Sequence, residues 1–134
     1  MHVKALELVI LLATLHGLTT NNIKVNVLGP VLFLIHINDI INASKILHLI
    51  LFADDTNIFL SNANLDKLIS TLNNELACML KWFAVNRLSL NVSKTNFVLF
   101  YNSRKRYDKC KTKIMFNGTV LEQVKHAKFL GVYI

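Results

Sequence analysis

Cysteine, proline and acidic residues are all scarce in this chain of 134 residues. The two cysteines, Cys78 and Cys110, form no CxxC pair and have no histidine nearby at metal spacing, which excludes a disulfide scaffold and indicates no zinc site. The five histidines are scattered as well, so packing or surface roles are expected for them. The single proline, Pro30, marks an element boundary, and there is no internal repeat or low-complexity stretch.

Charge is scarce too, and it is unevenly spread. Charged residues make up 17% of the chain and hydrophobic residues 53%, which predicts a single folded domain and excludes a disordered tail. The net charge is +7. Three lysines and four acids lie at or before Leu60, whereas twelve basic residues and four acids follow it. The densest basic run contains Arg104, Lys105, Arg106, Lys109, Lys111 and Lys113. Such a run favours either contact with a phosphate backbone or a solvated loop.

No apolar run is long enough to cross a membrane as a helix. The run from Leu8 to Ala13 follows Lys4 and loosely resembles a secretory signal, but Glu7 interrupts it and no good cleavage pattern follows. We therefore interpret residues 1–27 as a leader or non-homologous segment, with a short buried helix or a signal peptide as alternatives. No membrane partner is expected.

Local patterns predict the first three elements after this segment. Gly29-Pro30 suits the start of a buried helix over residues 31–41 that ends near residues 42–44. Apolar runs at 46–52 and 57–60 flank two aspartates, which predicts an antiparallel hairpin with the aspartates at its turn. Apolar residues then recur at helical spacing over residues 65–86, with Asn62 or Asn64 as the N-cap.

Extended segments follow this helix. Strands are expected within residues 96–101, 113–116, 119–124 and 128–134, and Asn117-Gly118 suits a second tight hairpin turn because both positions tolerate positive φ. The order of elements predicts an α+β fold in which helices pack on one face of an antiparallel sheet.

Asp54 and Asp55 are the residues most suited to chemistry. Adjacent carboxylates at a hairpin turn repel each other unless a cation lies nearby. Carboxylate oxygens suit Mg²⁺, which usually binds through one or two carboxylates and substrate phosphates. Enzymes of phosphoryl transfer use two such ions. An isolated Asp-Asp pair is more often a plain polar turn than a metal site, so its context decides.

That context is an ordered series of four motifs, which covers residues 28–134. They are Leu28-Gly29-Pro30-Val31-Leu32-Phe33 with Asn38-Asp39, Phe52-Ala53-Asp54-Asp55, Leu90-Asn91-Val92-Ser93-Lys94-Thr95, and Lys128-Phe129-Leu130-Gly131-Val132. The series resembles the palm domain of reverse transcriptases from non-LTR retrotransposons of the jockey-like and related lineages. The resemblance implies a partial polymerase palm that acts as an RNA-directed DNA polymerase by descent.

The resemblance also implies roles for single residues. Asp54 and Asp55 would bind Mg²⁺, with Asp54 the main ligand, and Lys94 would help to protonate the leaving pyrophosphate. Phe129, Leu130 and Gly131 would contact the primer end. The partners would be an RNA template, a DNA primer and deoxynucleotides, in an intracellular location.

Two departures from the family pattern predict that the chain is inactive alone. In the family, a third metal-binding carboxylate lies on a strand upstream of the Gly-Pro helix. No segment before Gly29 matches the sequence motif of that strand. Val25 stands where the family has a glycine, and segments that match fingers and thumb are not found. Two alternatives remain open, namely a non-catalytic basic module that binds nucleic acid and a small secreted protein.

Overall fold

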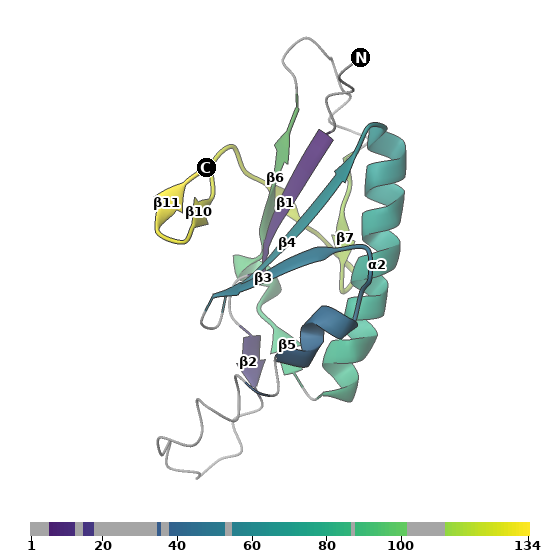
Figure 1. The fold of residues 1–134 in the computed structure, drawn as a ribbon, viewed down its shortest axis with the longest axis vertical. Coiled ribbons are helices and arrows are strands. Elements are labelled where there is room, and N and C mark those ends of the chain that lie inside the picture. Colours follow the sequence, from purple (N-terminus) through teal and green to yellow (C-terminus); the bar gives the residue numbers. More distant parts are fainter. Residues whose placement is uncertain are drawn as a thin grey trace.

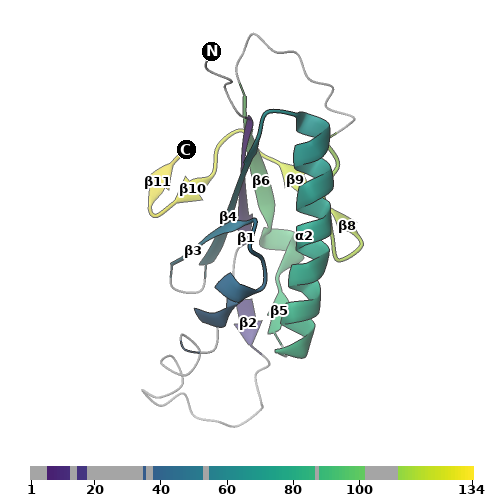
Figure 2. The same cartoon turned by 45° about the vertical axis from the view of Figure 1, so that its right-hand side comes forward.

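The fold is a five-stranded sheet with one long helix packed along one of its faces (Figure 1). The computed structural model describes residues 6–12, 15–17, 35, 38–52, 55–86, 88–101 and 112–134. Figure 2 shows that the sheet lies between the helix and a small C-terminal hairpin, so helix, sheet and hairpin form three layers. The mixture of a helix with largely antiparallel strands agrees with the predicted α+β class.

The sheet is assembled from strands that lie far apart in the sequence. Its order is β3-β4-β1-β6-β9. The strands are β3 (His48–Phe52), β4 (Asp55–Asn62), β1 (Leu6–Leu12), β6 (Asn96–Phe100) and β9 (Glu122–Gln123). Neighbouring strands are antiparallel except β6 and β9, which are parallel. In the register, Leu11 of β1 pairs with Asn57 on one side and Asn96 on the other.

The apolar run near the N-terminus is a strand, and the alternative of a short buried helix is wrong. Residues 6–12 form β1, with hydrogen-bonded neighbours on both sides. A nearly continuous apolar run is also typical of a strand in the interior of a sheet. A second short strand, β2 (Leu15–Gly17), pairs with β5 (Leu88–Leu90). The interpretation of residues 1–27 as a non-homologous leader stays a prediction.

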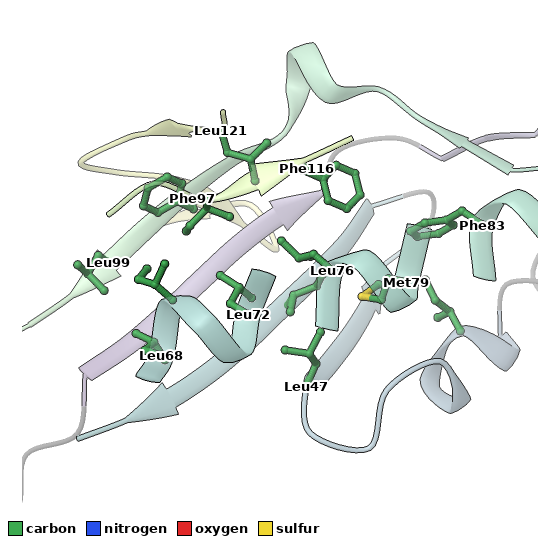
Figure 3. Packing of buried hydrophobic residues seen from close by; sticks show 14 of the residues in the cluster. Leu47, Leu68, Leu72, Leu76, Met79, Phe83, Phe97, Leu99, Phe116 and Leu121 are labelled. Carbon is green, nitrogen blue, oxygen red and sulfur yellow. The ribbon is translucent and has the colours of Figure 1, made fainter. Parts of the chain in front are cut away.

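The helix α2 (Leu65–Val85) confirms the prediction from apolar periodicity. Asn64 caps it, because its side-chain oxygen accepts a hydrogen bond from the Lys67 backbone N–H at 3.2 Å. The helix buries one face, which consists of Leu68, Ile69, Leu72, Leu76, Met79 and Phe83. These side chains form one buried cluster with Phe97 and Leu99 of β6 and with Phe116 and Leu121. Figure 3 shows Leu68 and Leu72 on the side of Leu99 and Phe97, and Met79 and Phe83 at the other end of the cluster. This cluster is the core of the domain.

The hairpin at Asn117-Gly118 is also confirmed. It joins β7 (Met115–Phe116) to β8 (Thr119–Val120), and the two turn residues have φ of 51° and 75°. Both angles lie in the left-handed region that a tight hairpin turn needs. The Asn73 side chain of α2 accepts a hydrogen bond from the Met115 backbone N–H at 3.0 Å, which fixes the hairpin to the helix.

Two extended segments are more broken than predicted. The expected strand at 119–124 is split into β8 and β9, because Leu121 turns inward and its N–H donates to the Ile114 carbonyl at 2.9 Å. The expected strand at 128–134 folds back on itself as β10 (Lys128–Phe129) and β11 (Val132–Tyr133). Leu130 and Gly131 form its turn, with φ of 49° and 84°.

Most of the helix expected over residues 31–41 lies outside the described residues. Its end is described as the 3-10 helix η1 (Asp39–Asn42), which ends within the predicted boundary. Ile40 of η1 is fully buried in the core. After it, the Ser44 hydroxyl donates to the Glu75 carboxylate at 2.5 Å and accepts from the Leu47 backbone N–H at 3.0 Å, which ties this segment to α2. Within the described part of the chain, no helix is long and apolar enough to cross a membrane.

Candidate functional site

The hairpin β3–β4 places Asp55, one of the two predicted metal ligands, at one end of the sheet. Phe52 pairs with Asp55, so a two-residue connection joins the strands, as predicted. Asp55 begins β4 and is exposed. Asp54 lies outside the described residues. Within the described ranges, no group of three histidine, cysteine or acidic residues is arranged to hold a metal.

The central strand β1 ends beside this hairpin. Leu12, its last residue, pairs with Thr56, the residue after Asp55. Glu7 pairs with Ser61 instead. Six residues of strand separate Ser61 from Asp55, which is about 20 Å at the rise of a β-strand. Because metal–oxygen bonds are about 2.0 to 2.6 Å long, Glu7 and Asp55 cannot bind one ion together.

Lys94 lies at the same end of the sheet as Asp55. It ends the short 3-10 helix η2 (Val92–Lys94), two residues before Asn96 of β6. Since Leu11 pairs with both Asn57 and Asn96, β4 and β6 begin on either side of the end of β1. One strand therefore separates the start of β4 from the start of β6, a spacing of about 10 Å. Lys94 is exposed, so its side chain is available to contact a ligand bound beside Asp55.

The hairpin β10–β11 contacts the face of the sheet opposite α2. The Phe129 ring meets the Phe59 ring edge to face, with centroids 5.5 Å apart. Because side chains alternate along a strand, Phe59, Asn57 and Asp55 point to one face. Figures 1 and 2 both show this hairpin and α2 on opposite sides of the sheet. Phe129 therefore lies on the same face as Asp55, four residues along β4.

The tip of this hairpin is free for contact. Leu130 is 48% exposed, and Val132 and Tyr133 are more exposed still. Gly131 sits at the turn with positive φ, and a Cβ built on it would have no atom within 4 Å. The left-handed backbone, and not a lack of space, is what favours glycine there. The predicted primer-contacting residues Phe129, Leu130 and Gly131 are thus brought together in one exposed turn.

The predicted basic run is not brought to this site as far as it is described. Arg104, Lys105, Arg106, Lys109 and Lys111 lie outside the described residues. Lys113 is exposed, and its carbonyl accepts from the Asn73 side chain of α2 at 3.4 Å. The next residue, Ile114, packs in the core with α2. Lys113 therefore lies on the helix side of the sheet, away from Phe129.

The sequence prediction missed one cluster beside the candidate site. His48 of β3 lies next to Phe59, with ring centroids 6.3 Å apart, so Phe59 contacts an aromatic ring on either side. The sequence does contain a pattern that could have predicted this cluster. In β3, His48 and Ile50 alternate with Leu49 and Leu51, which gives the strand two largely apolar faces. A second face that is apolar indicates a further layer on the sheet.

Comparison with known proteins gave one match. The family model described as "Reverse transcriptase (RNA-dependent DNA polymerase)" matches residues 26–134. Searches of curated proteins and of solved structures gave no match. The matched range contains the hairpin with Asp55, the helix α2, Lys94 and the β10–β11 turn, which are the parts assembled above.

Proposed function

This chain belongs to the reverse transcriptase (RNA-dependent DNA polymerase) family, and from that premise we propose that it is part of a polymerase palm that carries out no nucleotidyl transfer alone. The motif series from Leu28 to Val132 supports the finer assignment to non-LTR retrotransposons of jockey-like lineage. On this proposal the ligands are an RNA template, a DNA primer and deoxynucleotides, and the protein is intracellular. Asp54, Asp55 and Lys94 keep the roles that the resemblance implies.

One observation carries the proposed inactivity. The strand β1 ends beside Asp55, and it is the neighbour that could supply a carboxylate from the other side of a metal pair. The sequence contains no acidic residue between Glu7 and Asp39, and Glu7 pairs about 20 Å away along β4. Two-metal catalysis needs ligands that hold both ions against the attacking and leaving oxygens. Of the acidic residues that the structure describes, Asp55 of the hairpin is the one at the end of β1.

The donor set therefore suits one weakly held Mg²⁺ and not a pair. Asp54 and Asp55 would hold such an ion through carboxylate oxygens, and most of its remaining ligands would be water or phosphate. An ion bound in this way supplies electrostatic attraction for a phosphate group. The residues present do not fit the two-metal arrangement, so we derive no catalytic step through it.

Primer extension tests this proposal. The purified chain is expected to extend no primed RNA template with either Mg²⁺ or Mn²⁺, because positioning and charge stabilisation supply most of the acceleration in phosphoryl transfer. Asp54→Asn serves as the matched control, since it removes one charge with little change of shape. Extension by the parent chain that Asp54→Asn abolishes would refute the proposal, whereas extension that survives Asp54→Asn would indicate a contaminating polymerase.

A second candidate is binding of nucleic acid without catalysis. The observation that favours it is the exposed apolar and aromatic turn of β10–β11, which shares a face with Asp55. Aromatic and apolar side chains beside a basic chain suit stacking against bases while charge attracts the phosphates. The two candidates are compatible, because a palm without its full metal set still presents its binding surface. Filter binding of a labelled primer–template measures this activity directly.

A further inference from the structure

The strand β3 is the outermost strand of the five-stranded sheet. Its inner side pairs with β4, and none of the described residues pairs with its outer side (Figure 1). Outer strands usually carry a lysine, a proline or a bulge, which prevent another strand from pairing there. From His48 to Phe52, β3 has no charged residue, no proline and no bulge in its register. Among the described parts of the chain, this edge is therefore open to pairing.

The backbone of β3 directs hydrogen-bonding groups outward at two leucines. The Ile50 carbonyl accepts a hydrogen bond from the Asn57 side chain of β4 at 3.4 Å, so this carbonyl points toward β4. Along a strand, successive carbonyl groups point to opposite sides. The carbonyl and N–H groups of Leu49 and Leu51 therefore point away from β4, to the open edge. Unpaired backbone groups of this kind are the template for pairing with another strand.

The residues of β3 complement a second copy of the same strand. We propose that two copies of this chain associate by antiparallel pairing of their β3 strands about a two-fold axis at Ile50. In that register Leu49 lies opposite Leu51 of the other copy, and the outward groups of both leucines are satisfied. Each leucine is only partly buried in one copy, so pairing also covers apolar surface.

The charges at the two ends of β3 favour the same arrangement. Lys45 precedes the strand and is exposed, and Asp55 follows the hairpin turn and is exposed. Antiparallel pairing brings each Lys45 to the end of the interface where the other copy has Asp55. The exposed Ile46 lies at the same end. The part of the chain up to Leu60, which contains β3, has three lysines and four acids, whereas the whole chain has a net charge of +7.

Sedimentation velocity of the full chain over a range of concentrations tests the proposal. We expect the parent chain to shift reversibly from monomer to dimer. Ile50→Lys places two like charges opposite each other on the axis, and it should raise the dimer dissociation constant by about tenfold or more. The control is Ser70→Lys, which adds the same charge at an exposed position of α2 and should leave the dimer intact. Circular dichroism establishes that both variants are folded.

Two further measurements identify the interface. Amide hydrogen exchange at Leu49 and Leu51 should slow as concentration rises, whereas the exposed loop amide of Lys125 should not change. Lys45→Glu should weaken the dimer. Adding Asp55→Lys should restore it, because the double substitution swaps the two charges and again places opposite charges at each end of the interface. A chain that is monomeric at every concentration overturns the proposal. So does a dimer that survives Ile50→Lys with Leu49 and Leu51 unprotected.

Discussion

Two buried threonines differ in whether their hydroxyl groups are hydrogen-bonded. Thr56 is 1% exposed and its Oγ1 has no hydrogen-bond partner among the described residues, whereas Thr95 is 4% exposed and its Oγ1 donates to the Asn91 carbonyl at 2.9 Å. A buried hydroxyl without a partner loses its bonds to water and gains none in return. The two residues therefore contribute to stability with opposite sign, although their burial is nearly equal.

Substitution by valine separates these contributions. Thr56→Val is expected to raise the free energy of unfolding by about 1 kcal/mol, because it removes the unpaired hydroxyl. Thr95→Val is expected to lower it by about 1 kcal/mol, because it leaves the Asn91 carbonyl without that donor. Urea denaturation followed by circular dichroism measures both changes. A loss of stability in Thr56→Val would show that its hydroxyl is satisfied in solution, by water for instance.

At the scale of elements, the attachment of α2 to the sheet depends on its apolar face. Leu72 is fully buried near the middle of that face. Leu72→Asp would bury an unpaired charge, so we expect a loss of about 4 kcal/mol or more in the free energy of unfolding, or failure to fold. Ser70→Asp is the matched control on the exposed face of the same helix and should change stability by no more than about 0.5 kcal/mol. Equal melting temperatures for the two variants would contradict the packing.

Elements specified by neighbouring residues were predictable from the sequence. The helix α2 follows from its apolar period and the Asn64 cap, and the hairpins β3–β4 and β7–β8 follow from two-residue turns of aspartate, asparagine or glycine type. The parallel contact of β6 with β9 was not predictable, because no local pattern marks it. The turn at Leu130 was missed as well, since leucine rarely adopts positive φ and only Gly131 hints at it.

The candidate site was predictable only in part, for the same reason. Its motifs are local, so Asp54, Asp55 and Lys94 could be named from sequence. Their arrangement depends on β1, which lies between β4 and β6 in the sheet but precedes β4 by more than forty residues in the chain. An apolar run such as residues 6–12 contains no information on which strands will flank it. The contact of Phe129 with Phe59 likewise needs the folded sheet.

For the molecule as a whole, the uneven charge predicts how nucleic acid would bind. Replacing Arg104, Lys105 and Arg106 by alanine should weaken binding for every sequence and flatten its salt dependence, by up to about 0.9 in the log–log slope for each lost phosphate contact on duplex. Lys67, Lys81 and Lys125 replaced by alanine are the control, because they remove the same charge elsewhere. Filter binding between low and moderate salt gives both slopes. Equal slopes in the two triple variants would show that net charge alone governs binding.

The sheet order has a consequence for the sequence of events during folding. β1 is synthesised before both of its partners, β4 and β6, which follow much later in the chain. The sheet therefore consists of two parts, β3–β4 and β6–β9, that are joined only through β1. Pairings over such long separations form slowly, and an apolar strand that waits for them is exposed to aggregation. On a ribosome, β1 must therefore be kept from other chains until β4 and β6 have both been made.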